Sequence, residues 1–513
     1  MIRNPYPDLR LLGEKAETQP THLWLESTSR CNTRCKTCPH FYATFGMDMS
    51  EEVFRKIQDG VLDGVRRVDL IGCGEPLIAR YWQTLFDMCA QKRIKVDITT
   101  NGICLSDPAL VRKLVANNVT LAFSCDGARK ETYEFVRPFI RWEKTLEAFE
   151  SIRRCAQEAG RGKHFTLRIN FVAMKQNIAD LPDLVRMAKR YGASSIYVMQ
   201  LSYAEELPRL TGQSLHDAPE LVVAPMLKAL WLGFLYGIHV SVPHRFREHI
   251  LQVPGHGNRL RARATRLARL AFLGLVALRT KGFKRMAEIL FFGFGPKSKV
   301  SKTFCSAPWE DSFIAADGVV HPCCVDHPLG DLKTQKWRDI WEGEPYRNLR
   351  RTIHGWNPTR VCRFCELANG LNGGDRNQYA RFFARFKREA IPLDSLRAEA
   401  GLHALETSPD GAFTYRWTER RCRFSIPLPR RASFLELKIF PLAPCQKLNS
   451  GRCTINNGPA EPFDTSCDVL HFPLTGVRAD RLEVELELAE AFQVDGDPRE
   501  LALGICGIEL LSE

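Results

Sequence analysis

Three cysteines occur within eight residues near the N-terminus. Cys31, Cys35 and Cys38 come shortly after the apolar run at 22–26, with spacings of three and two residues. Thiolates are soft ligands that suit iron–sulfur clusters and zinc. Three ligands in one loop leave one position of a four-iron cluster open, whereas a structural zinc ion needs a fourth ligand. His40 is the only local candidate for that ligand, so both interpretations stand on this loop alone.

A second group of cysteines lies in the second half of the chain. It consists of Cys305, Cys323, Cys324, Cys362 and Cys365. Short cysteine pairs separated by a loop are typical of metal sites, and zinc ribbons share this pattern. Asp326 and His327 follow the adjacent pair of cysteines. These two residues are candidates to face a substrate, and the alternative is a solvated loop.

Polar residues follow several of the apolar, β-branched segments. Gly72-Cys73-Gly74-Glu75-Pro76 follows one segment, and Ser124-Cys125-Asp126-Gly127 follows another. Glycines let a backbone approach a ligand closely, and a carboxylate can receive an ammonium group. A plain interpretation exists for each, since such motifs are also frequent turns. Arg137 could equally be a solvated helix residue, and Asn170 could cap a strand.

The composition is that of an ordinary globular protein. The chain has 513 residues, of which 44% are hydrophobic and 26% charged, which is enough for roughly two to four domains. No apolar segment reaches the roughly 18 residues of a membrane span, and the N-terminus lacks the apolar region of a signal peptide. Eighteen cysteines without such a signal indicate metal chemistry in a reducing compartment, so we expect a cytoplasmic protein.

Strand-like and helix-like segments alternate between residues 20 and 243. Strands are expected at 67–71, 95–99, 120–123, 166–172 and 195–199, and helices at 50–62, 108–117, 142–158 and 178–191. This rhythm predicts an α/β fold with a parallel sheet and crossover helices. Ligands of such sheets bind at the carboxyl ends of the strands, where the polar motifs fall.

The first cysteine loop, followed one strand later by Gly72-Cys73-Gly74-Glu75-Pro76, resembles the radical SAM superfamily. Thr37 stands where that family usually has an aromatic residue. The resemblance implies a partial (β/α)6 TIM-type barrel in which the three loop cysteines hold a [4Fe–4S] cluster. S-adenosylmethionine (SAM) would bind the open iron and, on reduction, break into methionine and a 5′-deoxyadenosyl radical. That radical would abstract a hydrogen atom from the substrate.

The same resemblance assigns roles to the polar residues. The glycine-rich motif would contact the methionine amino group of SAM. Ser124 would bind the ribose or the carboxylate, Arg137 would pair with the carboxylate, and Asn170 would reach the adenosine side. The candidate SAM-binding residues are Gly72, Gly74, Glu75, Ser124, Asp126, Arg137 and Asn170.

The second cysteine group resembles the SPASM/twitch extension of radical SAM enzymes, which binds an auxiliary iron–sulfur cluster. No cysteine lies within 366–374, which favours a single auxiliary [4Fe–4S] cluster. Its expected ligands are Cys305, Cys323, Cys362 and Cys365. Cys324 would be a spare thiol near the active site or a ligand in place of Cys323. Asp326 is the candidate general base if the reaction is an oxidation.

Residues 244–302 interrupt the strand–helix pattern. They are rich in arginine and lysine with interleaved apolar residues, which predicts one or two basic amphipathic helices. One interpretation is an ordinary insertion that packs its apolar face on the body of the protein. Another is peripheral contact with an anionic membrane or a lipid-linked phosphate substrate, as the net charge of +13 allows. Nucleic acid is the least favoured partner, because no RNA-reading module is present.

The sequence pattern changes again near residue 386. Residues 398–405 are expected to close a helical linker, and the period-two segments that follow predict a small β-sandwich. The ending Asp497-Pro498-Arg499-Glu500-Leu501-Ala502-Leu503-Gly504 loosely resembles accessory β-modules of bacterial enzymes that make cell-surface glycans. The expected organisation is a segment 1–20, a radical SAM core 21–243, an insertion 244–302, an auxiliary-cluster domain 303–385 and an accessory domain 386–513.

The favoured function is oxidation or epimerisation of a sugar or sugar-derived substrate, lipid- or nucleotide-linked. The twitch-like cysteine count, the basic insertion and the C-terminal module favour this small-molecule or glycan substrate. A low-potential donor such as flavodoxin or ferredoxin would supply the electron. One alternative is a peptide-modifying maturase, although only about 20 residues precede the first strand, too few for a leader-binding domain. The alternative from another class is a zinc-stabilised binding protein without catalysis.

Overall fold

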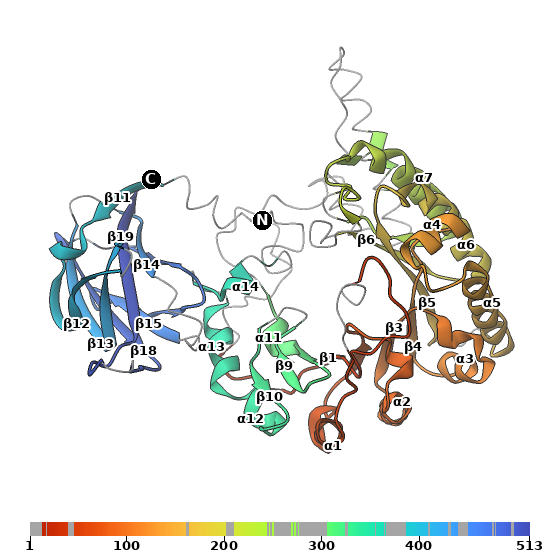
Figure 1. Cartoon of the computed structure of the whole chain (residues 1–513), viewed down its shortest axis with the longest axis horizontal. Coiled ribbons are helices and arrows are strands. Elements are labelled where there is room, and N and C mark those ends of the chain that lie inside the picture. The colour runs from red at the N-terminus through yellow and green to blue at the C-terminus, as the bar shows by residue number, and fades with distance from the viewer. Residues whose placement is uncertain are drawn as a thin grey trace, which may run out of the picture.

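The computed structural model describes residues 13–16, 18–38, 46–160, 164–201, 210–243, 246, 249–250, 268–269, 271–272, 275, 305–323, 327–353, 355, 357–363, 365, 386–408, 411–428, 432–439, 450–474, 477, 479–493 and 497–512. Within these residues, a mostly parallel sheet of ten strands and an antiparallel sheet of nine strands organise the chain (Figure 1). His40, Cys324, Asp326 and nearly all of 244–302 lie outside the described residues, so the expectations for them stay predictions.

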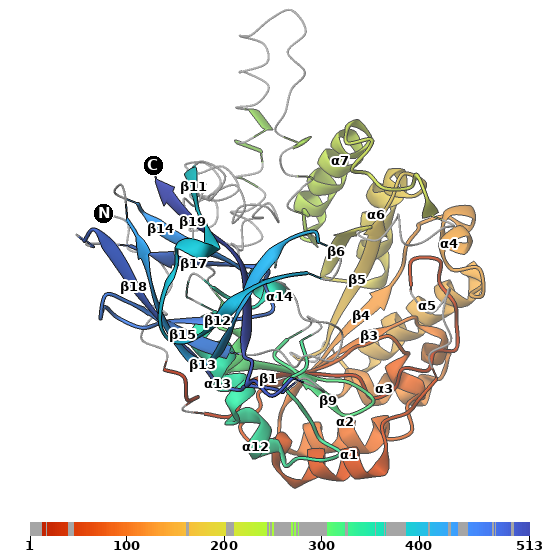
Figure 2. The same ribbon diagram turned by 60° about the vertical axis from the view of Figure 1, so that its left-hand side comes forward.

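The first sheet has the strand order β10-β9-β8-β1-β2-β3-β4-β5-β6-β7. Its strands are β1 (His22–Leu25), β2 (Arg67–Leu70), β3 (Lys95–Thr100), β4 (Val119–Ser124), β5 (Thr166–Ala173), β6 (Ser195–Gln200), β7 (His239–Val240), β8 (Asp311–Ile314), β9 (Val319–His321) and β10 (Gly330–Asp331). Neighbours from β8 through β1 to β7 run parallel, and β9 and β10 run antiparallel. The sheet is curved and open, because its order begins and ends on different strands (Figures 1 and 2). It is the expected partial barrel.

Helices cover the outer side of this sheet (Figures 1 and 2). They are α1 (Glu51–Lys56), α2 (Trp82–Gln91), α3 (Pro108–Val115), α4 (Lys130–Val136), α5 (Trp142–Glu158), α6 (Leu181–Tyr191) and α7 (Glu220–Tyr236). Shorter turns are the π-helix η3 (Ile57–Val61) and the 3-10 helices η4 (Pro76–Ile78), η5 (Ile103–Ser106) and η6 (Ile178–Asp180). The helix α5 has the bounds expected from the sequence.

Local sequence signals set where the helices begin and end. The side chain of Ser50 accepts a hydrogen bond from Val53 N–H, 3.3 Å away, at the start of α1. Asp107 caps α3 in the same way, and Pro108 follows it at the first helical position. The helix α6 ends at Gly192, whose φ of +79° is a left-handed conformation that glycine adopts without strain.

Alternation along the strands separates a helix-facing side from a concave side. On β4, Phe123 is fully buried and stacks on Phe149 of α5, with ring centroids 4.2 Å apart. Its neighbour Ser124 therefore faces the concave side. Asn170 on β5 is paired in register with Ser124, so it faces the same side. The concave side thus collects polar candidates from adjacent strands.

The region after residue 305 extends the same sheet. The strand β8 lies beside β1, with His22 opposite Asp311 and Leu25 opposite Ile314. The helices of this region are α11 (Ala307–Glu310), α12 (Trp337–Trp341), α13 (Glu344–Thr352) and α14 (Arg360–Arg363). Because β1 leads into the first cysteine loop and Cys305 precedes α11, adjacent strands connect the two cysteine groups.

The C-terminal sheet has the order β16-β15-β18-β13-β19-β14-β17, with β12 paired to β13 and β11 to β19. Its elements are β11 (Lys387–Ile391), η8 (Leu393–Ser395), β12 (Arg397–Thr407), β13 (Thr414–Pro427), β14 (Phe434–Ile439), β15 (Ser450–Ile455), β16 (Glu461–Asp464), β17 (Val469–Pro473), β18 (Arg481–Leu488) and β19 (Leu503–Ser512). Phe463 on β16 lies 5.8 Å from Phe472 on β17, between ring centroids. The strands β16 and β17 are the two edge strands of this order. Because their aromatic rings are in contact, the sheet folds back so that both edges pack on one core, as the β-sandwich prediction requires.

One prediction in this region was wrong. Residues 398–405 form part of the strand β12, where a helical linker was expected. The alanine, leucine and glutamate content favours a helix, but pairing with β13 overrides that weak preference. Gly401 adopts a φ of +63° at an irregularity of this pairing, and a Cβ there would lie 2.0 Å from Arg421 O. In the described part of the chain, no helix is long and apolar enough to cross a membrane.

Candidate active site

The first cysteine loop follows β1 at the carboxyl end of the strand. Cys35 is buried, and Cys31 and Cys38 are half-buried. The loop turns tightly, because Cys38 N–H donates to Cys35 O at 3.0 Å. Burial raises the pKa of Cys31 to about 11, and the neighbouring Cys35 and Cys38 add to this shift. The three thiols therefore lie close enough to interact, which fits a ligand set for one cluster.

The three thiols are not close enough to one another to bind a single metal ion. Among the described residues, no group of three or more histidine, cysteine, aspartate or glutamate side chains is tight enough to surround a single metal ion. The fit of the loop to a cluster therefore rests on its three soft thiol donors and on the polar groups that converge around them.

Arg137 joins the cysteine loop to the sheet. Its Nη1 lies 3.3 Å from Cys35 Sγ, and its Nε and Nη2 donate to Asp126 Oδ2 at 2.8 and 2.7 Å. Burial alone would lower the pKa of Arg137, but Asp126 and Cys35 outweigh it and raise the pKa. Asp126 is anchored in turn, since its Oδ1 accepts from Val172 N–H at 2.8 Å. A fixed positive charge thus stands beside the loop, where the sequence placed a carboxylate partner of SAM.

Glu75 is almost fully buried behind the same loop. Its Oε1 accepts from Thr100 Oγ1 at 2.8 Å and from Leu77 N–H at 3.3 Å, and its Oε2 accepts from Asn101 N–H at 2.7 Å. Burial raises the pKa of Glu75 to about 7, against the opposing effect of these hydrogen bonds. A carboxylate has about four lone-pair positions. Three are used within the protein, which leaves about one for an ammonium donor.

The glycines before Glu75 have a packing role that the sequence did not indicate. A Cβ on Gly74 would lie 2.3 Å from Thr28 O, and one on Gly72 would lie 2.4 Å from Glu26 Cγ. Both positions must therefore be glycine for the loop to lie against residues 26–30. The glycines thus allow a close approach to the segment between β1 and the cysteine loop, and their contact with SAM stays a prediction.

Ser124 and Asn170 lie side by side on the concave side. Asn170 is 7% exposed, and its Oδ1 has no hydrogen-bond partner among the residues that the structure describes. Leaving a buried acceptor unpaired costs about 1–3 kcal/mol. A ligand hydroxyl or amino group would remove this cost, which fits the expected contact on the adenosine side of SAM.

Some contacts of the site were not expected from the sequence. Asn101 Nδ2 donates to Asn32 Oδ1 at 2.8 Å and lies 3.8 Å from Cys31 Sγ. Glu26 Oε1 accepts from Cys73 N–H at 2.6 Å, and its Oε2 accepts from Ala316 N–H at 3.1 Å. Glu26 therefore ties the glycine-rich loop to the segment after β8. The sequence signal for this role was the position of Glu26, directly after β1.

Tyr197 also escaped the sequence analysis. It is paired in register with Asn170 and is 49% exposed, whereas Ile196 and Val198 beside it are buried. The Arg168 guanidinium lies 5.7 Å from the Tyr197 ring centroid. An accessible aromatic ring with a cation beside it thus adjoins the candidate SAM contacts, and it offers a surface for part of a substrate.

The auxiliary cysteines come from several elements. Cys365 N–H donates to Cys362 O at 3.3 Å. Burial raises the pKa of Cys362 to about 12, and Cys305 and Cys365 add to the shift. Burial also raises the pKa of Tyr346, with a contribution from Cys323. Cys305 and Cys365 thus lie near enough to Cys362 to affect its pKa, and Cys323 near enough to Tyr346 to affect that of the phenol, although within the described residues these cysteines are not tight enough to surround a single metal ion.

His327 begins the described chain after Cys324 and Asp326. It is 8% exposed, and its N–H donates to His321 Nδ1 at 3.1 Å. The alternative of a solvated loop does not fit His327, because this residue is packed against the end of β9. Cys324 and Asp326, the two candidate catalytic residues, lie outside the described residues, so their catalytic roles stay predictions.

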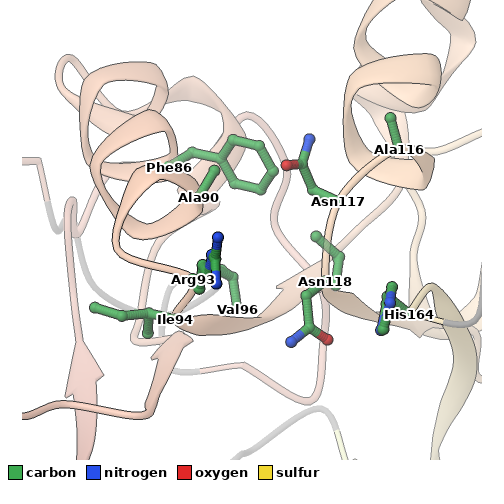
Figure 3. Close-up of a pocket in the computed structure, with 10 residues that line it drawn as sticks. Phe86, Ala90, Arg93, Ile94, Val96, Ala116, Asn117, Asn118 and His164 are labelled. Atoms are coloured by element: carbon green, nitrogen blue, oxygen red, sulfur yellow. The ribbon is translucent and has the colours of Figure 1, made fainter.

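A cavity of about 290 Å³ lies elsewhere in the sheet (Figure 3). It is lined by Arg93 and Ile94 before β3, Asn117 and Asn118 before β4, and His164 before β5. These positions are at the amino ends of the strands, opposite the cysteine loop. Ligands of parallel α/β sheets bind at the carboxyl ends, so this cavity is separate from the candidate active site.

Comparisons with known proteins agree with this geometry. Residues 25–188 match the model of the radical SAM superfamily, and residues 305–366 match that of SPASM, an iron-sulfur cluster-binding domain. The chain therefore carries a radical SAM domain and an SPASM domain. These domains imply a [4Fe–4S] cluster, SAM and an auxiliary cluster, for which the two cysteine groups supply the thiols.

Three curated proteins illustrate the range of relatives. Mycofactocin maturase MftC of Mycobacterium tuberculosis is 26% identical over 38% of this chain and 48% of the relative. AdoMet-dependent heme synthase of Methanosarcina barkeri is 24% identical over 67% of this chain and 89% of the relative. PqqA peptide cyclase of Granulibacter bethesdensis is 25% identical over 36% of this chain and 48% of the relative. The chain thus spans about half the length of the maturase and the cyclase.

Proposed function

We propose that this radical SAM enzyme modifies a peptide, by a reaction in which the auxiliary cluster accepts an electron. The observation that carries the proposal is the pairing of β1 with β8, His22 opposite Asp311. It joins the strand that leads into the first cysteine loop to the strand that follows Cys305. Because this pair is parallel, the first cysteine loop follows the carboxyl end of β1 and Cys305 precedes the amino end of β8, so one sheet carries both cysteine groups. We infer that a substrate on the concave side of this sheet lies between the SAM site and an electron acceptor.

The substrate class follows from the relatives. PqqA peptide cyclase carries a peptide in its name, and mycofactocin maturase MftC is named for a maturation. The sugar-derived substrate favoured by the sequence has no such support, so the peptide-modifying alternative is the better interpretation. The exposed Tyr197 and its neighbour Arg168 suit an extended chain with a carboxylate or an aromatic side chain.

The chain's own residues would position and shield the reactants. Arg137 and Glu75 would hold the two charged groups of the amino acid part of SAM, and Ser124 and Asn170 the nucleoside part. When bound, the cluster and SAM supply hydrogen-atom abstraction by one-electron chemistry. The buried surroundings of Cys35 and Glu75 exclude water, which protects a reactive species from side reactions. A flavodoxin or ferredoxin would deliver the first electron.

The proposal is tested by isotope transfer. The reconstituted enzyme is incubated with SAM, a reductant and one of two deuterated pools from the source organism, either short peptides or nucleotide- and lipid-linked sugars. We expect deuterium in 5′-deoxyadenosine only with the peptide pool, together with a mass change in one peptide. Deuterium transfer from the sugar pool alone would contradict the peptide proposal and restore the sugar-derived substrate.

Tyr197 provides a second arm of the same experiment. Tyr197→Ala removes the exposed ring without touching the cysteine loop. We expect the variant to form 5′-deoxyadenosine at the basal rate in the absence of substrate, and to lose most of the stimulation by the peptide pool. Undiminished stimulation would remove Tyr197 from the substrate-binding surface.

A further inference from the structure

The SPASM segment that carries Cys362 lies against one edge of the C-terminal sheet. The strand β17 ends the order of that sheet, and it pairs with β14 on one side. Figure 1 shows α13 and α14 beside the C-terminal domain. An exposed strand edge presents unpaired backbone groups, so whatever covers it is held by hydrogen bonds as well as by packing.

Asn357 covers that edge in the manner of a neighbouring strand. Its side chain donates from Nδ2 to His471 O at 2.9 Å, and its Oδ1 accepts from His471 N–H at 2.7 Å. Asn357 is fully buried, so both bonds form away from water. Arg363 repeats the contact two residues along the strand, since its Nη1 donates to Val469 O at 2.8 Å. Because Arg363 directly follows Cys362, this hydrogen bond holds the chain next to the expected cluster ligands Cys362 and Cys365.

The connection between β16 and β17 holds the same segment from another side. Arg360 N–H donates to Ser466 Oγ at 2.8 Å, and Cys467 Sγ lies 3.7 Å from Pro358 O. Asp464 accepts from Asn348 Nδ2 of α13 at 3.2 Å. These contacts are spread over 348–363 on one side and 464–471 on the other. The interface is therefore a continuous polar clamp.

The clamp rests on a buried pair within the C-terminal domain. His471 Nε2 lies 2.8 Å from Glu436 Oε2, and both side chains are at most 5% exposed. Arg388 also pairs with Glu436. The β17 edge is thus held before it meets the SPASM segment, because a buried carboxylate that loses a hydrogen-bond donor costs free energy.

We propose that the C-terminal β-domain is part of the auxiliary cluster site, and that Asn357 positions the segment bearing Cys362 and Cys365 by pairing with β17. The domain then serves the second cluster, in addition to any binding role of its own. Asn357 is a positioning residue, since it touches neither cluster ligand directly in the described structure. This inference is independent of the substrate class.

The test uses the full chain reconstituted anaerobically with iron and sulfide. Asn357→Ala leaves the N–H and C=O of His471 without their partner. We expect it to lose about four of about eight irons per chain and the electron paramagnetic resonance spectrum of the auxiliary cluster. The cluster at the first cysteine loop and the basal cleavage of SAM stay as in the wild type.

A matched variant separates positioning from general loss of stability. Asn456 also lies in the C-terminal domain, and its Oδ1 accepts from Glu483 N–H at 2.6 Å, away from the SPASM contacts. Asn456→Ala should keep both clusters even where it lowers the melting temperature as much as Asn357→Ala. Loss of the auxiliary cluster from both variants would overturn the proposal, because domain stability alone would then explain the effect.

A milder variant keeps the proposal testable where Asn357→Ala folds poorly. Ser466→Ala removes the acceptor of Arg360 N–H and the contact of the Ser466 hydroxyl with the Cys467 thiol. We expect the auxiliary cluster to assemble with a shifted reduction potential and an altered resonance spectrum, since the ligand segment is held less firmly. An unchanged potential and spectrum in Ser466→Ala, with eight irons retained in Asn357→Ala, would contradict the inference. A wild type with only about four irons would instead remove the auxiliary cluster itself.

Discussion

The two cysteine groups are built in opposite ways. The first draws its thiols from eight consecutive residues, and partners from across one sheet support it, among them Arg137 at 3.3 Å from Cys35 Sγ. The second draws its thiols from residues 305–365, and a separate antiparallel domain supports it through Asn357 and Arg363. A local loop needs neighbours only for orientation, whereas a dispersed set needs them for assembly. We therefore expect damage at the second site to spread further through the chain.

The largest expected effect separates the two sites completely. Cys31→Ala should abolish 5′-deoxyadenosine formation, because the first loop then offers two thiols only, and it should leave the auxiliary cluster intact. The measurements are product formation by chromatography and iron per chain. Cys89→Ala, a buried cysteine of α2, is the matched control and should behave as the wild type. SAM cleavage that survives in Cys31→Ala would refute the catalytic assignment.

Cys362→Ala is the corresponding change at the second site. We expect about half of the iron to be lost, while basal cleavage of SAM persists and the modified product disappears, since the electron acceptor is gone. Cys453→Ala truncates a buried cysteine of the C-terminal core and should retain the full iron content. Product formation at the wild-type rate in Cys362→Ala would show that the reaction does not use an auxiliary cluster.

Removing Arg137 probes the support of the first loop. Arg137→Ala leaves the Asp126 carboxylate buried without the guanidinium that pairs with it. This loss should lower the free energy of unfolding by about 3–5 kcal/mol. Chemical denaturation of the iron-free protein measures this loss. The double variant Arg137→Ala/Asp126→Ala should recover part of it, because no lone carboxylate remains. Additive effects of the two changes would contradict the pairing.

The joint between the two regions should respond to pH. Burial alone would lower the pKa of His22, but Asp311 on β8 and Asp69 on β2 raise it to about 9. A raised pKa stabilises the folded state fully below the unfolded value near 6.5, and this stabilisation is lost as pH rises to about 9. We expect the unfolding free energy to fall by about 2–3 kcal/mol over that window.

His22→Gln is the control for this pH dependence. The variant lacks the titrating ring, so the difference in unfolding free energy between wild type and variant isolates the contribution of His22. That difference should shrink as pH rises from 6.5 to 9. A difference that stays constant over this range would mean that His22 and Asp311 do not form an ion pair between β1 and β8.

The smallest expected effect concerns the nucleoside part of SAM. Asn170→Ala should raise the Kd for SAM about tenfold, the equivalent of one hydrogen bond of about 1.4 kcal/mol. The melting temperature without SAM should change little, because the Oδ1 of Asn170 has no partner to lose in the described structure. Asn118→Ala, at the cavity beyond the amino ends of the strands, should leave the affinity unchanged. Equal effects of both variants would contradict the assignment.

The parallel half of the fold could be predicted from the sequence because its signals are local. Each strand was a compact β-branched segment, each helix had its own periodicity, and α5 lies where it was expected, at Trp142–Glu158. The polar ends of the strands indicated the position of the site for the same reason. Strand order then brought Glu75, Asn101 and Arg137 around the cysteine loop.

The remaining features depend on contacts between distant residues. The strand β12 has a helix-favouring composition and becomes a strand only by pairing with β13. Glu26 acquires its role from Cys73 and Ala316, which lie far apart in the sequence. Asn357 likewise gains its partner from His471. No periodicity in one chain announces such pairings, so the support of both sites had to come from the structure.

The most direct test of two cluster sites joined by one sheet is the iron content of the wild-type chain after anaerobic reconstitution. We expect about eight irons, of which about four remain in the triple variant Cys31→Ala/Cys35→Ala/Cys38→Ala. About four irons in the wild type, all lost in that variant, would contradict the auxiliary site and remove the proposed electron acceptor. Zinc in place of iron would contradict the enzyme itself.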